Sequence, residues 1–123
     1  MNACRSRGQM AHHAGIAAER CVAQDYERRG FTVARERWRG PAGEIDLITR
    51  DADGLVFVEI KKSRSFAQAA ARLDARQMAR IRSSAEAFLA GEPNGSLTNM
   101  RFDVALVDQF GAVEIIENAF GQY

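Results

Sequence analysis

Apolar side chains first recur at the spacing of a helix, between about residues 12 and 29. The recurring positions are Ile16, Val22, Ala23 and Tyr26. Gly30 follows them and is typical of a helix C-terminus. Glu19 falls inside this apolar stripe, where a carboxylate is costly unless another group pairs with it. The pattern predicts a first helix that carries one carboxylate in need of a partner.

From residue 31 the apolar positions alternate with polar ones, which predicts three strands at about residues 31–38, 44–50 and 55–62. The Gly-Pro-Ala-Gly segment at 40–43 separates the first two strands. The Asp-Ala-Asp-Gly segment at 51–54 is typical of a hairpin turn between the second and the third.

The hairpin turn sets a register for these two strands. If Arg50 pairs with Leu55 across the turn, Asp46 lies opposite Glu59. Two carboxylates that face each other repel, so this pair calls for a cation. Strand alternation also places Lys61 on the same face as Glu59.

Helical spacing returns at about residues 67–90, and two further strands follow at 101–108 and 112–117. The core face of this second helix consists of Met78, Ile81, Ala85, Phe88 and Leu89. The element order is αβββαββ. A hairpin-rich start followed by a long crossover helix predicts an α/β fold with a mixed central sheet flanked by helices. We expect one domain over residues 12–123, after a flexible tail at 1–11.

The composition narrows the class of protein. A chain of 123 residues suits one compact domain. No apolar run approaches the roughly 20 residues of a membrane span, and the N-terminus lacks the apolar stretch of a signal peptide. Two cysteines, Cys4 and Cys21, do not indicate a disulfide framework. We therefore expect no membrane contact and a reduced, cytoplasmic setting.

Charge is segregated along the chain although the net charge is only +1. Residues 42–60 carry five acidic side chains and one basic one, whereas residues 61–82 carry seven basic side chains and one acidic one. An acidic patch beside basic stretches suits a metal site next to a polyanion, and scattered solvated charge is the alternative.

An Asp on one strand and a Glu-x-Lys on the next can hold a divalent metal and activate a water molecule. Asp46 and Glu59 supply two carboxylates here, and the Ile60 carbonyl can add a third oxygen. Lys61 can orient the water or neutralise developing charge. Lys61 and Lys62 are the only lysines in the chain, and strand alternation turns Lys62 to the opposite face.

Five short segments occur in an order that makes the chain recognisable. They are Gly-Ile-Ala-Ala-Glu at 15–19, Gly-Glu-Ile-Asp-Leu-Ile at 43–48, Val-Phe-Val-Glu-Ile-Lys at 56–61, Arg-Phe-Asp-Val at 101–104 and Asn-Ala-Phe at 118–120. Over nearly its whole length the chain resembles the YraN family of small bacterial proteins. That family looks like part of the PD-(D/E)XK, or restriction-endonuclease-like, superfamily and is similar to Holliday-junction resolvases.

The resemblance implies a restriction-endonuclease-like fold and a catalytic site at Asp46, Glu59 and Lys61, with Glu19 as a fourth member. It implies Mg²⁺ or Mn²⁺ as the cofactor, held by Asp46, Glu59, Ile60 and Glu19. We expect nucleic acid, DNA in particular, to contact further side chains, and a homodimer is compatible with a symmetric junction. The expected contacts are Lys62, Arg64, Arg72, Arg76, Gln77, Arg80, Arg37 and Trp38.

Most of these residues also have a purely structural interpretation. Asp46 and Lys61 can form a cross-strand ion pair, and Glu19 can pair with an arginine. Gln77 can belong to a local hydrogen-bond network, and Trp38 can cover the end of the core instead of stacking on a base. The four-residue spacing of Arg72, Arg76 and Arg80 describes either a phosphate-binding row or a solvated helix face. Asp103 suits a structural pair with Arg101 better than a role in a site.

The function that these residues favour is hydrolysis of DNA phosphodiester bonds by a Mg²⁺-dependent endonuclease, acting on branched or single-stranded substrates. The alternative is a nucleic-acid-binding module of the same fold that does not cleave efficiently. A protein-interaction domain whose charges serve solubility is a third interpretation.

Overall fold

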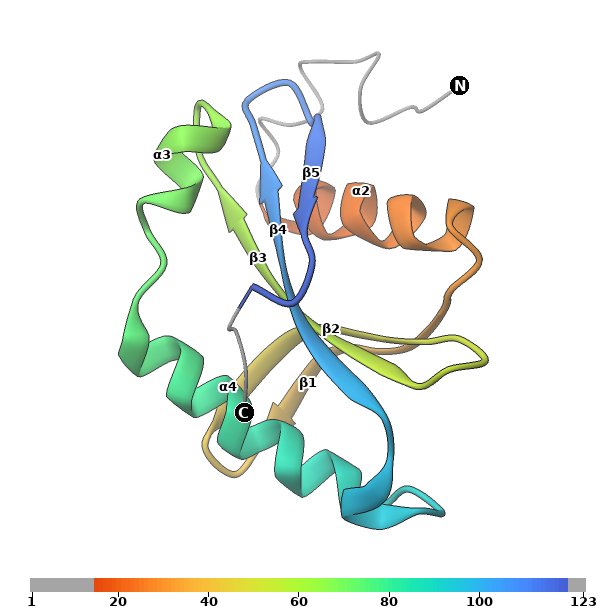
Figure 1. The fold of residues 1–123 in the computed structure, drawn as a ribbon. Coiled ribbons are helices and arrows are strands. Elements are labelled where there is room, and N and C mark those ends of the chain that lie inside the picture. Colours follow the sequence, from red (N-terminus) through yellow and green to blue (C-terminus); the bar gives the residue numbers. More distant parts are fainter. Residues whose placement is uncertain (1–14, 120–123) are drawn as a thin grey trace.

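The computed structural model describes residues 15–119 of the chain, and the side chains from Ala18 onward (Figure 1). The helices are α2 (Gly15–Arg28), α3 (Phe66–Ala70) and α4 (Ala75–Leu89), with a short 3-10 helix η2 (Gly95–Leu97). The strands are β1 (Thr32–Gly40), β2 (Gly43–Arg50), β3 (Leu55–Lys62), β4 (Met100–Val107) and β5 (Val113–Ile116). The predicted tail at 1–11 lies outside the described residues.

The five strands form one sheet in the order β1-β2-β3-β4-β5. Neighbouring strands are antiparallel except β3 and β4, which are parallel and are joined by the crossover through α3 and α4. The α/β prediction of a mixed sheet flanked by helices is therefore confirmed, and it is consistent with a restriction-endonuclease-like fold.

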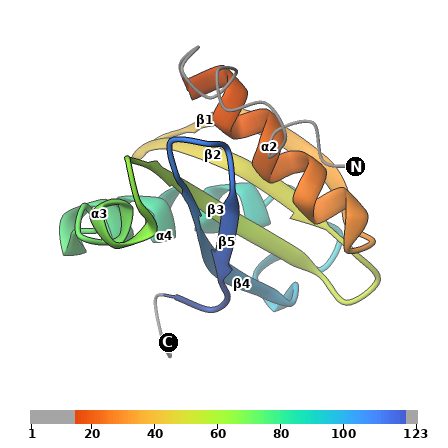
Figure 2. The ribbon, with the colours of Figure 1, turned by 90° about the horizontal axis from the view of Figure 1, so that it is seen from above.

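Helices cover both faces of the sheet (Figures 1 and 2). On one face, α2 buries Val22 and Tyr26 against Leu47 and Val58. On the other face, α4 buries four of its five predicted apolar side chains fully or partly against the sheet, whereas Met78 is half-buried outside that core. Ile81, Ala85 and Leu89 of α4 pack there with Ile45, Ile48 and Phe57. The central hairpin thus contributes side chains to two cores, as a sheet covered on both sides requires.

The turn between β2 and β3 has the predicted register. Arg50 pairs with Leu55, and the pairing continues to Leu47 and Val58. The turn is closed by the Asp51 N–H, which donates to the Gly54 carbonyl at 3.0 Å. Gly54 has φ 155° and lies so close to Asn99 that a Cβ there would be 2.2 Å from the Asn99 carbonyl oxygen. Only glycine satisfies this turn.

The crossover between β3 and β4 differs from the prediction. Instead of one helix over 67–90, the chain forms the short α3 and then α4, and the two are separated by residues 71–74. Asp74 ends the interruption as the N-cap of α4, because its carboxylate accepts the Gln77 N–H at 3.0 Å.

The interruption also corrects the predicted arginine row. Arg72 precedes α4, and its Nη1 donates to the Lys62 carbonyl at 2.7 Å. Only Arg76 and Arg80 share one helix face at four-residue spacing.

A buried carboxylate ties the two layers to the C-terminal segment. Asp103 on β4 is fully buried and accepts from Tyr26 Oη at 2.7 Å, from Arg101 Nε at 3.0 Å and from the Asn118 N–H at 3.0 Å. The predicted structural pair of Asp103 with Arg101 is confirmed, because the two form a salt bridge.

Two expectations about location have different outcomes. No helix among residues 15–119 is long and apolar enough to cross a membrane. Cys21 is disulfide-bonded, which does not fit the reduced setting expected from two cysteines. A count of two cysteines argues against a framework of several bridges, but it does not exclude a single bond.

Candidate active site

The site begins where the regular pairing of β2 with β3 stops. Beyond the Leu47–Val58 pair, the Asp46 carboxylate takes the place of a backbone acceptor, and its Oδ2 accepts the Ile60 N–H at 2.8 Å. The side-chain alternation of β2 also changes here, since Ile45 and Ile48 pack against the same core although they are three residues apart. This irregularity turns Asp46 toward β3.

The neighbouring strand is distorted at the same level. Arg37 lies between the residues that pair with Leu47 and Ile45, and is therefore opposite Asp46. Its φ of 52° is in the left-handed region, which is uncommon for any residue except glycine and asparagine. Backbone strain of this kind clusters at functional sites.

Glu59 meets Asp46 from β3 in a buried position. The Glu59 side chain is only 7% exposed, and the two carboxyl groups lie within hydrogen-bonding reach of each other. Burial and then the Asp46 charge raise the pKa of Glu59 to about 7, and burial raises the pKa of Asp46 above its ordinary value. The pair therefore holds a proton more tightly than two exposed carboxylates would.

Lys61 and Gln77 complete the cluster. The Lys61 ammonium lies 3.3 Å from Glu59 Oε2 and donates to Gln77 Oε1 at 2.6 Å. Gln77, from the first turn of α4, also donates through Nε2 to Glu59 Oε2. The structure thus brings together Asp46, Glu59 and Lys61 as the sequence predicts.

Glu19 stands beside this cluster but not within it. Its carboxylate is 3.9 Å from Arg37 Nε, and burial raises its pKa while Arg37 opposes the rise. Asp46 is near enough to raise the Glu19 pKa further. Among residues 15–119, however, no three His, Cys, Asp or Glu side chains come close enough to hold a metal ion. The contact with Arg37 is the arginine pairing predicted as the alternative role of Glu19. The role of Glu19 as a metal ligand stays a prediction.

The predicted nucleic-acid contacts have different surroundings. Arg64, Arg76 and Arg80 are exposed, and Arg80 reaches toward the β1–β2 turn, where its Nη1 lies 3.9 Å from the place of a Cβ on Gly43. Lys62 is half-buried at the end of β3. The Trp38 ring packs edge-to-face against Phe88 at 5.2 Å, which fits its alternative role as a cover of the core.

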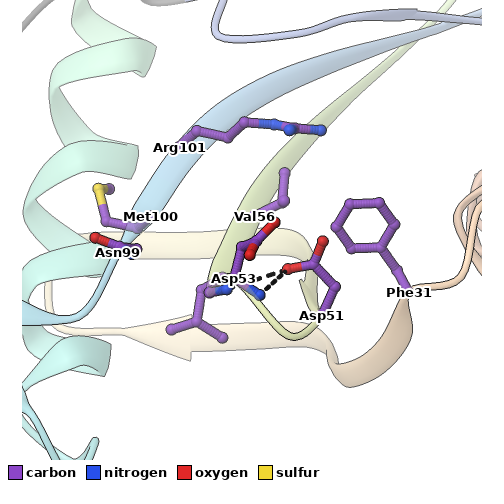
Figure 3. Close-up of a pocket in the computed structure, with 9 residues that line it drawn as sticks. Phe31, Asp51, Asp53, Val56, Asn99, Met100 and Arg101 are labelled. Atoms are coloured by element: carbon purple, nitrogen blue, oxygen red, sulfur yellow. Dashed lines mark hydrogen bonds between the residues drawn. The ribbon is translucent and has the colours of Figure 1, made fainter.

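Two hollows of the described surface lie at the turn end of the β2–β3 hairpin, away from this cluster. One of them has a volume of about 160 Å³. Figure 3 shows Phe31, Asp51 and Arg101 around it. Two of its polar side chains already have partners, because Asp51 accepts amides of its own turn and Arg101 is paired with Asp103. The chemistry is therefore better supported at the carboxylate pair than in this cavity.

Sequence reasoning missed two features of the site. One is the left-handed Arg37, for which an arginine gives no local signal. The other is Asp74, whose spacing from Gln77 matches a capping box and marks the start of α4. The expectation that Ile60 contributes its carbonyl stays a prediction, whereas its N–H is engaged by Asp46.

Fold and site together define a mixed α/β protein with two buried carboxylates and a lysine at the irregular end of a central hairpin. Residues 18–107 match the Uncharacterised protein family UPF0102. The chain belongs to this family, and the YraN resemblance is thereby confirmed.

Relatives in the family extend over nearly the whole chain. A UPF0102 protein of Ruegeria pomeroyi is 61% identical over 121 residues, which cover 98% of both chains. A UPF0102 protein of Cereibacter sphaeroides (strain ATCC 17025) is 60% identical over 92% of this chain and 97% of its own length. A UPF0102 protein of Azorhizobium caulinodans is 45% identical over 94% of this chain and 88% of its own.

Proposed function

We propose that this protein is a divalent-metal-dependent endonuclease that hydrolyses phosphodiester bonds of DNA. The observation that carries the proposal is the buried contact of Asp46 with Glu59, with the Lys61 ammonium 3.3 Å from Glu59. Two carboxylates in contact inside a protein need either a proton or a cation between them.

The donor groups fit a hard divalent ion. Mg²⁺ and Mn²⁺ prefer oxygen ligands, and Asp46, Glu59 and the Ile60 carbonyl would hold the ion, with Glu19 acting through water. When bound, the ion would lower the pKa of a water molecule and offset charge on the phosphate.

The remaining side chains supply orientation and charge. Lys61 is a fixed cation beside the carboxylates, where it can orient the attacking water and stabilise negative charge that develops on the phosphate. Arg76 and Arg80 are exposed on α4, the helix that also supplies Gln77, and they suit contact with the flanking phosphates.

Cleavage of labelled linear, nicked, single-stranded and four-way DNAs with Mg²⁺ or Mn²⁺ tests this function. We expect cleavage that EDTA abolishes and that Asp46→Asn and Lys61→Met lower by about a hundredfold or more. Glu44→Gln is a matched control, because it removes an exposed carboxylate of the same strand. Cleavage that persists in Asp46→Asn would rule out this site.

A second function, nucleic-acid binding without efficient cleavage, is favoured by one observation. One oxygen of each carboxylate already has a protein partner, since Asp46 Oδ2 accepts from the Ile60 N–H and Glu59 Oε2 accepts from Gln77 Nε2. Filter binding over a salt series separates the two functions. Affinity that falls steeply with salt, in a protein that cleaves none of the DNAs, would support the binding module.

Variants of Arg76 and Arg80 test whether these exposed side chains contact nucleic acid in the same binding assay. Replacing Arg76 and Arg80 by Ala is expected to reduce the salt slope of binding by about two, whereas Arg28→Ala, which removes a partner of Asp25 on α2, should leave it unchanged. The homodimer and the cytoplasmic location stay predictions.

A further inference from the structure

Gln77 is the one side chain from α4 that bonds to both charged groups of the Glu-x-Lys segment. Its Oε1 accepts from the Lys61 ammonium at 2.6 Å, and its Nε2 donates to Glu59 Oε2. The direct separation of Lys61 Nζ from Glu59 Oε2 is longer, at 3.3 Å. The amide therefore bridges the two side chains on one edge of the site.

The orientation of this amide is fixed by its partners. An ammonium group can only donate, and an ionised carboxylate can only accept. The observed orientation places the amide oxygen on Lys61 and the amide nitrogen on Glu59, which satisfies both. The reverse orientation would set donor against donor and acceptor against acceptor, so the amide holds its two partners in a single arrangement.

The start of α4 explains how Gln77 reaches the site. Asp74 is the N-cap, and Gln77 is the third residue of the helix. In a capping box, a glutamine at this position turns back to the N-cap backbone. Here its oxygen accepts from Lys61 instead, while the Asp74 carboxylate fixes the Gln77 backbone N–H. The interruption between α3 and α4 thus aims Gln77 at β3.

We propose that Gln77 is a positioning residue that holds the Lys61 ammonium against Glu59 in the arrangement that hydrolysis requires. The inference rests on the proposed nuclease function. It gives Gln77 a positioning role, whereas the sequence predicts that Gln77 contacts nucleic acid. Both polar atoms of the amide are already engaged with charged groups, so Gln77 acts through Lys61 and Glu59 instead of on the substrate. Displacement of a catalytic group by about 1 Å can cost two orders of magnitude in rate.

The small number of lysines makes the proposal measurable. With ¹⁵N-labelled lysine, the side-chain ammonium spectrum of the described residues contains two signals, from Lys61 and Lys62, and Lys62→Arg assigns them. In the full-length wild-type protein we expect slow proton exchange for Lys61. Gln77→Met, which keeps the length but removes both bonds, is expected to speed this exchange by about tenfold or more.

Two further variants are controls for the Gln77→Met measurement. Gln68→Met makes the same change on α3, where the amide oxygen accepts only from the Ser63 hydroxyl, and should leave the Lys61 signal unchanged. Gln77→Glu keeps an acceptor for Lys61 but sets a carboxylate against Glu59, so Lys61 exchange should stay slow. Circular dichroism establishes that each variant is folded. A Lys61 signal in folded Gln77→Met that matches wild type would overturn the proposal.

Cleavage kinetics distinguish a positioning role of Gln77 from direct contact of Gln77 with the substrate. In single-substrate cleavage assays, Gln77→Met is expected to lower kcat about tenfold or more and to leave KM within about twofold. A raised KM with unchanged kcat would identify Gln77 as a substrate contact and overturn its positioning role. Wild-type protein that cleaves no DNA would defeat the proposed function, yet faster Lys61 exchange in Gln77→Met would still support the bridge.

Discussion

Glu59 is the residue whose surroundings constrain the chemistry most. Its pKa rises from 4.5 to about 7, first because it is buried and then because Asp46 is charged nearby. A carboxyl whose pKa is higher in the folded chain than in the unfolded chain takes up a proton on folding. The stabilisation by that proton is present at low pH and is lost as the pH rises through about 7.

The metal-free protein should therefore become less stable between pH 5 and pH 8, by about 2 kcal/mol from this group. Urea unfolding in EDTA at the two pH values measures the change. In Glu59→Gln the decrease should be smaller by this amount, whereas Asp53→Asn, in the exposed turn, should behave like wild type. A Glu59→Gln protein with the pH dependence of wild type would show that folding does not raise the pKa of Glu59.

Arg37 carries the backbone strain beside the pair. Glycine adopts a φ of 52° without a Cβ penalty, so Arg37→Gly should raise the free energy of unfolding by about 0.5–1 kcal/mol. The lost Glu19 contact, 3.9 Å long and half-exposed, contributes little. Arg35→Gly is the control on the same strand and should lower stability by a similar amount. Equal urea midpoints for the two glycine variants would contradict the strain.

At the scale of elements, the start of α4 connects helix formation to the site. Asp74→Ala removes the acceptor of the Gln77 N–H, so the first turn of α4 should fray and the protein should melt at a lower temperature. Amide hydrogen exchange at Gln77 measures the fraying directly. Asp74→Asn keeps an N-cap oxygen and should preserve protection. Undiminished protection of Gln77 in Asp74→Ala would show that the cap does not hold the turn.

Sequence patterns predicted the strands better than the crossover. The alternation of apolar positions and the Asp-Ala-Asp-Gly turn were sufficient to place β2 and β3 in register from Arg50–Leu55 to Leu47–Val58. The helix break was missed because its residues 71–74, Ala-Arg-Leu-Asp, contain no glycine or proline and begin with strong helix formers, so the cap at Asp74 was the only local signal. A capping pattern inside a predicted helix therefore merits as much weight as apolar spacing.

The proximity of the candidate residues was predictable, but their contacts were not. The hairpin register brings Asp46 near Glu59, and the Glu-x-Lys spacing adds Lys61. The bond from the Ile60 N–H to Asp46 depends on where the ladder stops, and the Gln77 bridge depends on how α4 packs on the sheet. Both are tertiary properties that spacing along one chain does not encode.

At the scale of the whole molecule, Asp103 joins the helix layer, the sheet and the C-terminal segment. Asp103→Ala would leave Arg101 without its buried partner and should cost about 3 kcal/mol or more, whereas Tyr26→Phe removes one hydrogen bond and should cost about 1 kcal/mol. Asp53→Ala in the exposed turn should change stability by less than about 0.5 kcal/mol. Thermal unfolding of the three variants checks this order, and an Asp103→Ala protein as stable as Asp53→Ala would refute it.

The molecule as a whole places a buried acidic pair beside exposed arginines, an arrangement that suits a metal ion and a polyanion together. The most direct test of that arrangement is calorimetric titration of the protein with Mn²⁺. We predict binding that is lost in Glu59→Gln and retained in Glu44→Gln. Absence of binding to the wild-type protein, or equal binding to Glu59→Gln, would contradict the assignment of Asp46 and Glu59 as a metal site.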